Sequence, residues 1–447
     1  MTGAMYAAIG GLKSHMTKLN VIGNNVANVN TPGYKAQRMT FQESIYTTSK
    51  SGSNGGVTMG GNNPSQIGYG CSVGSIDLNM SPSTYAPTGV GLDCMLTGEG
   101  FFMVGDKINY ERDETDPDNP VITGHGIQSA SDLTQPYLTR VGNFWVDADG
   151  YICNRDNKVL YGFARVQNPN YRPNADKAAI EAAKAQGIDI ESATIISTEL
   201  VPLRVPLSAA APTGGTDGNG GLVEVTEDGV TTTKALWEEG DPVYPYLNGA
   251  NENRYPSHKD SATNAGGTGT ITYPISGTQI AVAENTNENR VSEEMPVQLK
   301  NMQIGKDGSI TGTAANGKTV VIGYVAIASA DSPDGVTHMD GPYYKAMGGA
   351  GNLRVSALVD LPTKYLGNQV ATPGDGTAAN PGTTPNAADA ILSDSTNSIK
   401  NGGLEASSTD VANEFAEMIT TQRGYQANTR IITVTDSMLE ELVNMKR

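Results

Sequence analysis

The last forty residues of the chain carry a pattern that requires a packing partner outside the stretch itself. Positions spaced alternately four and three apart repeat the a/d step of a coiled coil, and seven of the ten are apolar or aromatic. The pattern predicts a helix over 408–447, about 60 Å long at about 1.5 Å per residue. Its seam consists of Val411, Phe415, Met418, Gln422, Tyr425, Thr429, Ile432, Asp436, Leu439 and Val443.

A second apolar row widens the predicted contact surface in the distal half of this helix. Because the apolar arc is broader than one neighbour needs, more than one helix must pack there. Ser407, with Asp410 three residues later, is expected to cap the start of the helix. The second row consists of Ala427, Ile431, Val434, Met438, Leu442 and Met445. The opposite face is polar, which excludes a membrane span, and consists of Asp410, Glu414, Glu417, Thr421, Gly424 and Asn428.

The N-terminal residues 1–35 predict a second amphipathic helix without a partner of its own. It is expected to stop at Thr31-Pro32-Gly33, because proline cannot continue a helix. Residues 1–35 carry three lysines and no acid, whereas residues 404–447 carry seven acids and four bases, so the two ends are complementary in charge. We infer that both ends order when their seams are buried. The N-terminal seam consists of Met5, Ile9, Leu12, Met16, Leu19 and Val26.

The composition favours β-rich modules over a large helical core. Aromatic residues make up 6% of the chain, and there are 53 glycines. Thirty basic residues against forty-seven acidic ones argue against nucleic acid or membrane lipid as partners. Cys71, Cys94 and Cys153 form neither a disulfide framework nor a zinc site. No cleavable signal peptide and no membrane span are expected.

The middle of the chain reads as nested modules. Residues 36–70 are predicted to be a linker, residues 71–165 with 297–403 a discontinuous mainly-β domain, and residues 166–296 an inserted outer domain. Two-residue hairpin turns are expected at Asp149-Gly150, Asp307-Gly308 and Asn316-Gly317. In the insertion we expect a short helix over 175–186 and a strand over 201–207. The fold class is therefore multi-domain, with α-helical coiled-coil termini formed by residues 1–35 with 404–447 around discontinuous mainly-β domains.

No constellation of residues in the sequence indicates catalysis. Gly98-Glu99-Gly100 lacks the spacing and the following helix of a phosphate loop. Asp147-Ala148-Asp149-Gly150 resembles a fragment of a calcium loop, but its glycine is misplaced and a hairpin turn fits better. We therefore predict no catalytic, cofactor-binding or metal-binding residues, no cofactor, and a protein that is not an enzyme.

Several segments together resemble the bacterial flagellar rod and hook proteins. The stretch Asn24–Lys35 is similar to the N-terminal signature of that family. Within the family, Gln66–Gly70 followed by Ser75–Asp77 is closer to the hook version than to the distal rod version. The resemblance to the C-terminal helix rests on Leu404-Glu405, Asp410-Val411 and Gln422–Asn428, and that to the inner β-domain on Gly98–Phe102, Arg140–Phe144 and Asp147–Tyr151.

This resemblance implies a subunit of a tubular polymer. The terminal helices would form its inner coiled-coil layer, the β-domain a middle layer and the insertion the outermost layer. It also implies export through the flagellar type III apparatus without a cleavable signal peptide, and an extracellular place as a flexible joint that transmits torque from rod to filament. The implied partners are further copies of the chain, the distal rod, the hook cap, the hook–filament junction proteins and the export apparatus.

Two other functions are compatible with the same sequence. The first is a distal rod subunit of the flagellar basal body, against which the long insertion argues. The second belongs to a different class, a secreted surface adhesin or hydrolase whose helices merely dimerise it. For a hook subunit and for a distal rod subunit alike, the residues of the two helical seams would be the assembly surface.

Overall fold

The computed structural model divides into two compact units. The first consists of residues 1–84 and 406–447, and the second of residues 85–405. The structure describes residues 2–56, 59–106, 137–168, 177, 180, 181, 192–197, 200–209, 238–244, 296–346, 348–351, 353–358 and 397–445, together with the backbone of short strands between 111 and 281. No helix among these described residues is long and apolar enough to cross a membrane.

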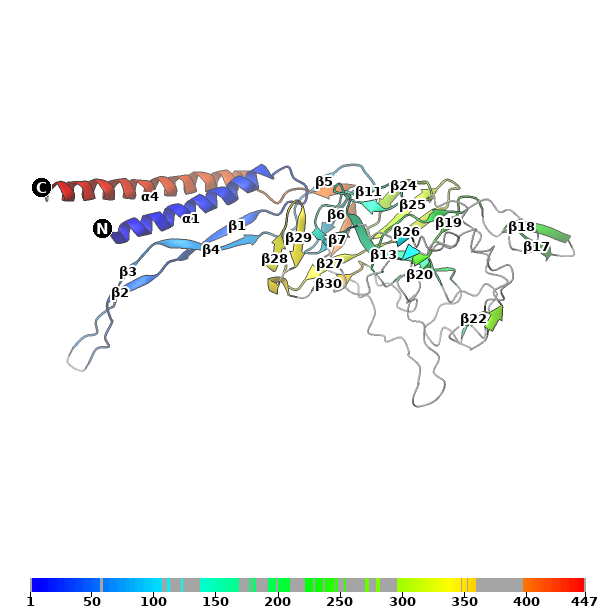
Figure 1. Cartoon of the computed structure of the whole chain (residues 1–447), viewed down its shortest axis with the longest axis horizontal. Coiled ribbons are helices and arrows are strands. Elements are labelled where there is room, and N and C mark those ends of the chain that lie inside the picture. The colour runs from blue at the N-terminus through cyan, green and yellow to red at the C-terminus, as the bar shows by residue number, and fades with distance from the viewer. Residues whose placement is uncertain are drawn as a thin grey trace. The chain divides into compact units, whose positions relative to one another are not determined.

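The first unit is built on two long antiparallel helices, α1 (Thr2–Ala27) and α4 (Val411–Met445) (Figure 1). A β-ribbon accompanies them, in which β1 (Gln37–Glu43) pairs with β4 (Cys71–Leu78). A second hairpin continues it, formed by β2 (Tyr46–Lys50) and β3 (Ser65–Gly68). The helix α1 contacts both α4 and the ribbon, so the unit has helical and β layers packed together.

The ends of both helices follow from their sequences, although not at the residues first expected. The carboxylate of Asp410 accepts the backbone N–H groups of Ala412 at 3.0 Å and Asn413 at 3.3 Å. Asp410 is therefore the N-cap, and the expectation for Ser407 is wrong, because the helix begins one turn later. The helix α1 ends at Ala27, and the Pro32-Gly33 turn that follows is closed by the Tyr34 N–H donating to the Thr31 carbonyl.

Residues 36–70, predicted as a linker, contain three strands. The glycine-rich composition belongs only to the tip of the β2–β3 hairpin, where Ser53 and Asn62 bridge across it. The strands on either side of the tip could not be predicted from local sequence, because their pairing joins residues more than thirty positions apart, such as Met39 and Ile76. The strand β4 lies in the first unit, whereas the sequence analysis assigned residues from 71 onward to the β-domain.

The second unit is organised around a 14-stranded sheet whose main path runs in the order β24-β25-β26-β13-β7-β10-β29-β28. Strand β13 pairs with β26, which joins the two β-rich blocks on either side of the insertion. The strands of this path are β24 (Leu299–Ile304), β25 (Ser309–Ala314), β26 (Thr319–Val325), β13 (Val159–Gln167), β7 (Phe101–Gly105), β10 (Tyr137–Thr139), β29 (Tyr343–Ala346) and β28 (Val336–His338).

Shorter strands complete this sheet or form two-stranded pairs. The strands β11 (Trp145–Val146), β12 (Ile152–Cys153), β14 (Thr194–Ile196), β15 (Val201–Pro202), β27 (Ile327–Ala330) and β30 (Leu353–Ser356) belong to the sheet. The pairs are β5 (Tyr85–Pro87) with β32 (Gly403–Glu405), β6 (Cys94–Thr97) with β31 (Ser398–Asn401), β8 (Glu111–Arg112) with β9 (Ile122–Thr123), β16 (Leu207–Ser208) with β19 (Pro242–Val243), β17 (Leu222–Glu227) with β18 (Val230–Ala235), β20 (Tyr246–Leu247) with β21 (Asn253–Arg254), and β22 (Thr270–Thr272) with β23 (Gln279–Ala281).

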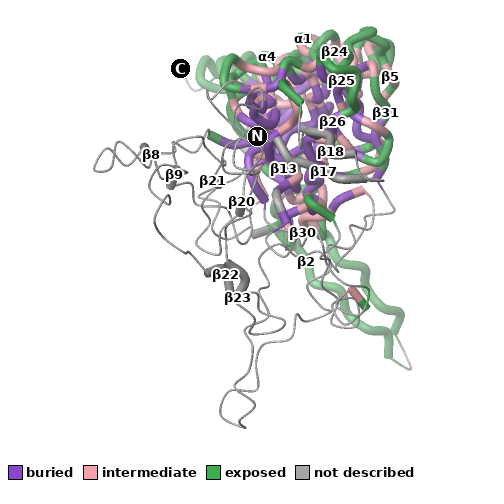
Figure 2. Tube along the Cα trace, turned by 90° about the vertical axis from the view of Figure 1, so that its right-hand side faces the viewer, coloured by how far each residue is buried: buried purple, intermediate pink, exposed green. Residues whose placement is uncertain are grey.

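The core of the second unit lies around the sheet strands, where buried residues gather (Figure 2). Phe102 packs edge-on against Phe144, with ring centroids 5.5 Å apart. Cys94 is fully buried in the same cluster, and burial raises the pKa of its thiol. The strand expected over 201–207 is present as the two short strands β15 and β16. Of the helix expected over 175–186, the structure describes only Lys177, Ile180 and Glu181, and these are helical.

The three predicted hairpins form, but each has a three-residue turn rather than a two-residue one. In each, the residue before the turn donates its N–H to the residue after it, and the last turn residue is a glycine with positive φ. This is a type I turn followed by a left-handed residue, a geometry that glycine adopts at no steric cost. The closing pairs are Asp147 with Tyr151, Gly305 with Ser309, and Ala314 with Lys318, and the glycines are Gly150, Gly308 and Gly317.

Candidate interaction site on the terminal helices

Small and polar residues make the closest approaches between α1 and α4. A β-carbon at Gly424 would lie 2.7 Å from Cε1 of His15, and one at Gly11 would lie 2.8 Å from Nδ2 of Asn428. Only residues without a side chain allow the helices to approach this closely. Lys18 extends the contact with an ion pair to Glu417, at 2.9 Å between Nζ and Oε2.

The side of α4 that meets α1 therefore includes most of the residues predicted to form the polar, outward face. Glu414, Thr421, Gly424 and Asn428 all lie on it, and Thr421 is only 3% exposed. The polarity of these residues predicts a face turned away from the packing surface. Small size outweighs polarity here, since threonine and glycine permit close packing and their polar neighbours find hydrogen-bond partners on α1.

Asn25 is the hub of a hydrogen-bond network where α1 ends and α4 begins. It is buried, and its Nδ2 donates to Glu414 Oε1 and to the Gln37 carbonyl, each at 2.8 Å. Its Oδ1 accepts the Tyr34 hydroxyl at 3.0 Å and the Gln37 N–H at 2.9 Å. Every polar group of this buried amide is thus satisfied, which fixes α1, α4 and β1 relative to one another.

Burial at the helix contact shifts the pKa values of three side chains. Burial raises the pKa of Glu414, because desolvation disfavours its charged form. Burial, followed by the Glu414 charge, raises the pKa of Tyr34 to about 12. His15 has a lowered pKa, first from burial and then from the Lys18 charge. In each of the three groups, burial thus disfavours the charged form.

The β1–β4 ribbon covers a second side of α1. The Ser14 hydroxyl donates to the Cys71 carbonyl at 3.3 Å. The Phe41 ring lies 5.4 Å from the His15 ring and 5.6 Å from the Lys18 ammonium. This cover was not foreseen, and the alternation of Met39 and Phe41 along β1 is the signal that could have indicated it.

Four of the thirteen predicted apolar seam positions are exposed in the single chain, and nine are half-buried. Phe415 is 50% exposed and Val443 is 67% exposed, although both are apolar seam positions of α4. On α1, Met16 is exposed in the same way. The exposed seam residues are Met16, Phe415, Leu439 and Val443, and the half-buried ones are Met5, Ile9, Leu12, Leu19, Val26, Val411, Met418, Tyr425 and Ile432.

The exposed apolar residues of α4 lie on two different flanks. A helix turns about 100° per residue. Phe415 and Ile419 therefore project on one side of the face that meets α1, whereas Ile431 and Val434 project on the other. All four are exposed, and Ile419 was missed because it falls between the two predicted rows. Apart from α1, α4 thus presents two separate apolar surfaces.

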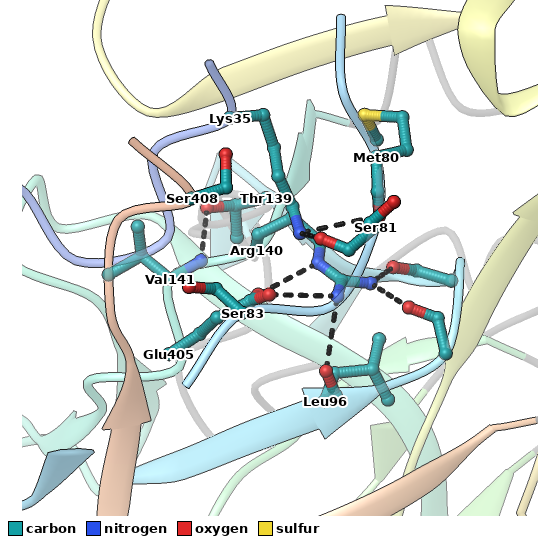
Figure 3. Close-up of polar contacts among 12 residues, drawn as sticks. Lys35, Met80, Ser81, Ser83, Leu96, Thr139, Arg140, Val141, Glu405 and Ser408 are labelled. Atoms are coloured by element: carbon teal, nitrogen blue, oxygen red, sulfur yellow. Dashed lines mark hydrogen bonds and ion pairs between the residues drawn. The ribbon is translucent and has the colours of Figure 1, made fainter. Parts of the chain in front are cut away.

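A buried ion pair stabilises the second unit where its last strand ends (Figure 3). Arg140 and Glu405 are both buried, with 3.1 Å between Nε and Oε2. The Arg140 guanidinium also donates to the carbonyls of Gly98 at 2.8 Å and Leu96 at 3.1 Å, and to that of Gly100. In the sequence, Arg140 and Glu405 are notable only as members of the family-like motifs, and nothing there indicates that they pair.

A buried lysine has a comparable role in the first unit (Figure 3). The Lys35 ammonium donates to the Ser81 carbonyl at 2.8 Å and to the Met80 carbonyl at 3.4 Å. The Ala36 N–H donates to the Ser408 hydroxyl at 2.8 Å, and the Ser83 hydroxyl donates to the Ser407 carbonyl at 2.8 Å. These hydrogen bonds therefore join the chain segment that precedes the second unit to the segment that follows it, just before α4 begins.

Comparison with known proteins gives consistent results for both helical ends. Residues 400–445 match the family model described as flagellar basal body rod FlgEFG protein C-terminal, and residues 5–35 match that described as flagella basal body rod protein. The flagellar hook protein FlgE of Borreliella burgdorferi is 27% identical, and the flagellar basal-body rod protein FlgG of Bacillus subtilis 26%, each over the whole of both chains.

Two further comparisons involve hook proteins. The flagellar hook protein FlgE of Salmonella typhimurium is 24% identical over 98% of this chain and 99% of its own length. The crystal structure of Helicobacter pylori flagellar hook protein FlgE2 aligns with a TM-score of 0.29 at 12% identity, covering 72% of this chain and all of that one.

Proposed function

This chain belongs to the bacterial flagellar rod and hook protein family, and we propose that it is the structural subunit of the flagellar hook, a tubular polymer that transmits torque from rod to filament. Two of the relatives described above that match nearly the whole chain are hook proteins. The rod protein of Bacillus subtilis makes the distal rod the second candidate.

The observation that carries the proposal is the arrangement of apolar side chains on α4. The helix meets α1 through small and polar residues, and leaves apolar residues exposed on two separate flanks. A surface of this kind on two sides favours contact with two neighbours rather than one. Such contacts are heterologous, and heterologous contacts that do not close generate a helical polymer.

The finer arrangement of the polymer follows from the family resemblance. The terminal helices would form an inner coiled-coil layer, the mainly-β domain a middle layer, and residues 166–296 the outermost layer. The subunit would reach the cell exterior through the flagellar export apparatus without a cleavable signal peptide. It would contact the distal rod at one end of the polymer, and the hook cap and later the hook–filament junction proteins at the other.

The location can be tested by immunogold electron microscopy of intact cells, with an antibody raised against residues 213–296. Label on a short curved segment between the cell body and the filament is expected for a hook subunit with an outermost insertion. Label that appears only after the envelope is stripped would identify a rod subunit. Label spread over the cell surface would favour the adhesin or hydrolase and contradict the proposal.

A further inference from the structure

The antiparallel register of the two helices leaves the end of α4 without a partner on α1. Gly11 lies against Asn428, His15 against Gly424, and Asn25 against Glu414, so each step back along α1 is a step forward along α4. Continuing this register places Thr2, the first residue of α1, at the same level along the helix axis as Ser437. The residues of α4 from Met438 to Met445 therefore extend beyond α1, as the two labelled termini show (Figure 1).

The face that α1 covers continues into this extension and changes character there. Thr421 and Thr435 are buried on the covered face. Residues three, four and seven positions after Thr435 lie on the same face of an α-helix, because these spacings approximate whole turns. They are Met438, Leu439 and Leu442, and they are exposed. The face is thus small and polar where α1 covers it, and apolar where α1 has ended.

Another surface of the same unit has complementary properties. Tyr6 and Met16 are exposed on α1, together with Lys13. By helical rotation they lie on the side of α1 turned away from His15 and Asn25, and so away from α4. The α4 extension is bordered by Glu440 and Glu441. An apolar surface with a basic residue therefore exists on α1, and an apolar surface with acidic residues on α4, and one chain cannot join the two.

We propose that the α4 extension, Met438–Met445, is a docking site for the outer face of α1 in a second copy of the chain. The α1 helix of the second copy would then follow the first chain's own α1 along the length of α4. This inference rests on the proposed function, because it supplies the contact by which one subunit binds the next along the axis. It assigns different partners to the two halves of one face, the chain's own α1 up to Thr435 and another chain's α1 beyond it.

Two singly substituted chains provide the test. One carries Met16→Cys and the other Leu442→Cys, both with Cys71→Ser, since the remaining Cys94 and Cys153 are buried. The chains are mixed, assembled, sedimented and treated with a mild oxidant that takes up the two electrons as the two thiols form one disulfide. Because each chain has one engineered thiol, a disulfide between residues 16 and 442 can form only between copies, and only where the Cα atoms approach within about 7 Å.

The matched control replaces Leu442→Cys by Ser437→Cys, which lies on the opposite side of α4 at the edge of the extension. We expect the 16–442 disulfide in the sedimented fraction at about tenfold the yield of the 16–437 disulfide, and neither in the dilute unassembled mixture. Equal yields for the two positions, or tubes without the 16–442 disulfide, would overturn this contact and leave the proposed function standing. If the unsubstituted chain forms no tubes, the proposed function fails, and this contact fails with it.

Discussion

Gly424 of α4 lies directly against the imidazole ring of His15 on α1, with 2.7 Å between the position of a β-carbon at residue 424 and Cε1 of His15. The same ring also packs against Phe41, with the ring centroids 5.4 Å apart. Together with the contact of Gly11 with Asn428, this contact limits how closely the two terminal helices can approach.

Gly424→Ala is expected to separate the helices and destabilise the first unit. Overpacking of this kind costs about 1–3 kcal/mol. The matched control is Gly23→Ala, since a β-carbon at Gly23 meets nothing within 4 Å, and alanine in a helix interior stabilises by about 1 kcal/mol. Urea unfolding followed by helical circular dichroism measures both. Equal stability of the two variants would contradict the close contact.

The stability of the first unit should fall in mild acid because of His15. Its folded pKa lies below the unfolded value of 6.5, so the unfolded chain binds the proton more readily. The stabilisation is therefore complete above pH 6.5 and is lost as the pH falls through the folded pKa. The groups facing His15 are Lys18 on α1, paired with Glu417, and Phe41 on β1. Within the described residues, Nδ1 of His15 has no hydrogen-bond partner.

His15→Leu should flatten this part of the pH profile, because leucine keeps the contact with Phe41 without titrating. The measurement is the helical circular dichroism melting temperature between pH 5 and pH 8. His338→Leu is the control, since His338 also has a pKa lowered by burial but lies in the second unit. If His338→Leu flattens the dependence of this melting temperature on pH and His15→Leu does not, His15 is not the group responsible.

Glu414 allows charge and hydrogen bonding to be separated. Its pKa is raised by burial, so the stability linked to it is fully present below the unfolded value of 4.5 and is lost as the pH rises through the folded pKa. Glu414→Gln keeps an acceptor for Asn25 and removes the charge, so it should be more stable than the unsubstituted chain at pH 7. Glu414→Leu leaves the buried Asn25 amide without that partner and should cost about 1–3 kcal/mol. Chemical unfolding at pH 4 and pH 7 distinguishes them, and identical effects of the two substitutions would exclude the hydrogen bond as the cause.

Removing one partner of the buried Arg140–Glu405 pair should destabilise the second unit strongly. Arg140→Met removes the ion-pair partner from the buried Glu405 carboxylate, at a cost of about 3–5 kcal/mol, whereas adding Glu405→Leu should recover much of the loss. Arg354→Ala is the control, because Arg354 and Asp331 form an exposed pair at 2.8 Å, and such pairs contribute at most about 1 kcal/mol. Tryptophan fluorescence during urea unfolding reports the outcome. A double variant no better than Arg140→Met would argue against an electrostatic origin.

Phe415→Asp should abolish polymerisation while changing the stability of the monomer by less than about 0.5 kcal/mol, because the side chain is half exposed in the single chain. Ile432→Asp should also prevent assembly, but Ile432 is half-buried, so some loss of monomer stability is expected as well. Phe415→Tyr, which keeps the apolar ring, should still assemble. Sedimentation and electron microscopy measure assembly, and normal tubes from Phe415→Asp would remove the seam argument.

The sequence predicts the elements of this fold better than it predicts their contacts. Apolar spacing predicted α1 and α4, and the glycines at 150, 308 and 317 predicted the hairpins, because both signals are local. Part of the α4 surface predicted to face outward meets α1 instead, since periodicity reports polarity and not the size that lets Gly424 approach His15. The pairs Asn25–Glu414 and Arg140–Glu405 join positions hundreds of residues apart, and no local pattern indicates which distant residue completes a hydrogen bond.

The pairing of β5 with β32 has a consequence for the order of folding. Asn25 and Glu414 are 389 residues apart in sequence, so closing that loop in an unfolded chain is entropically unfavourable. Once the second unit has formed, Tyr85 and Glu405 are neighbouring residues in a ladder. The chain that still separates the two helices is then only the two flanking segments, which lowers the closure cost by about 1–2 kcal/mol. Formation of the second unit before the two helices meet is therefore the order that the closure entropy favours.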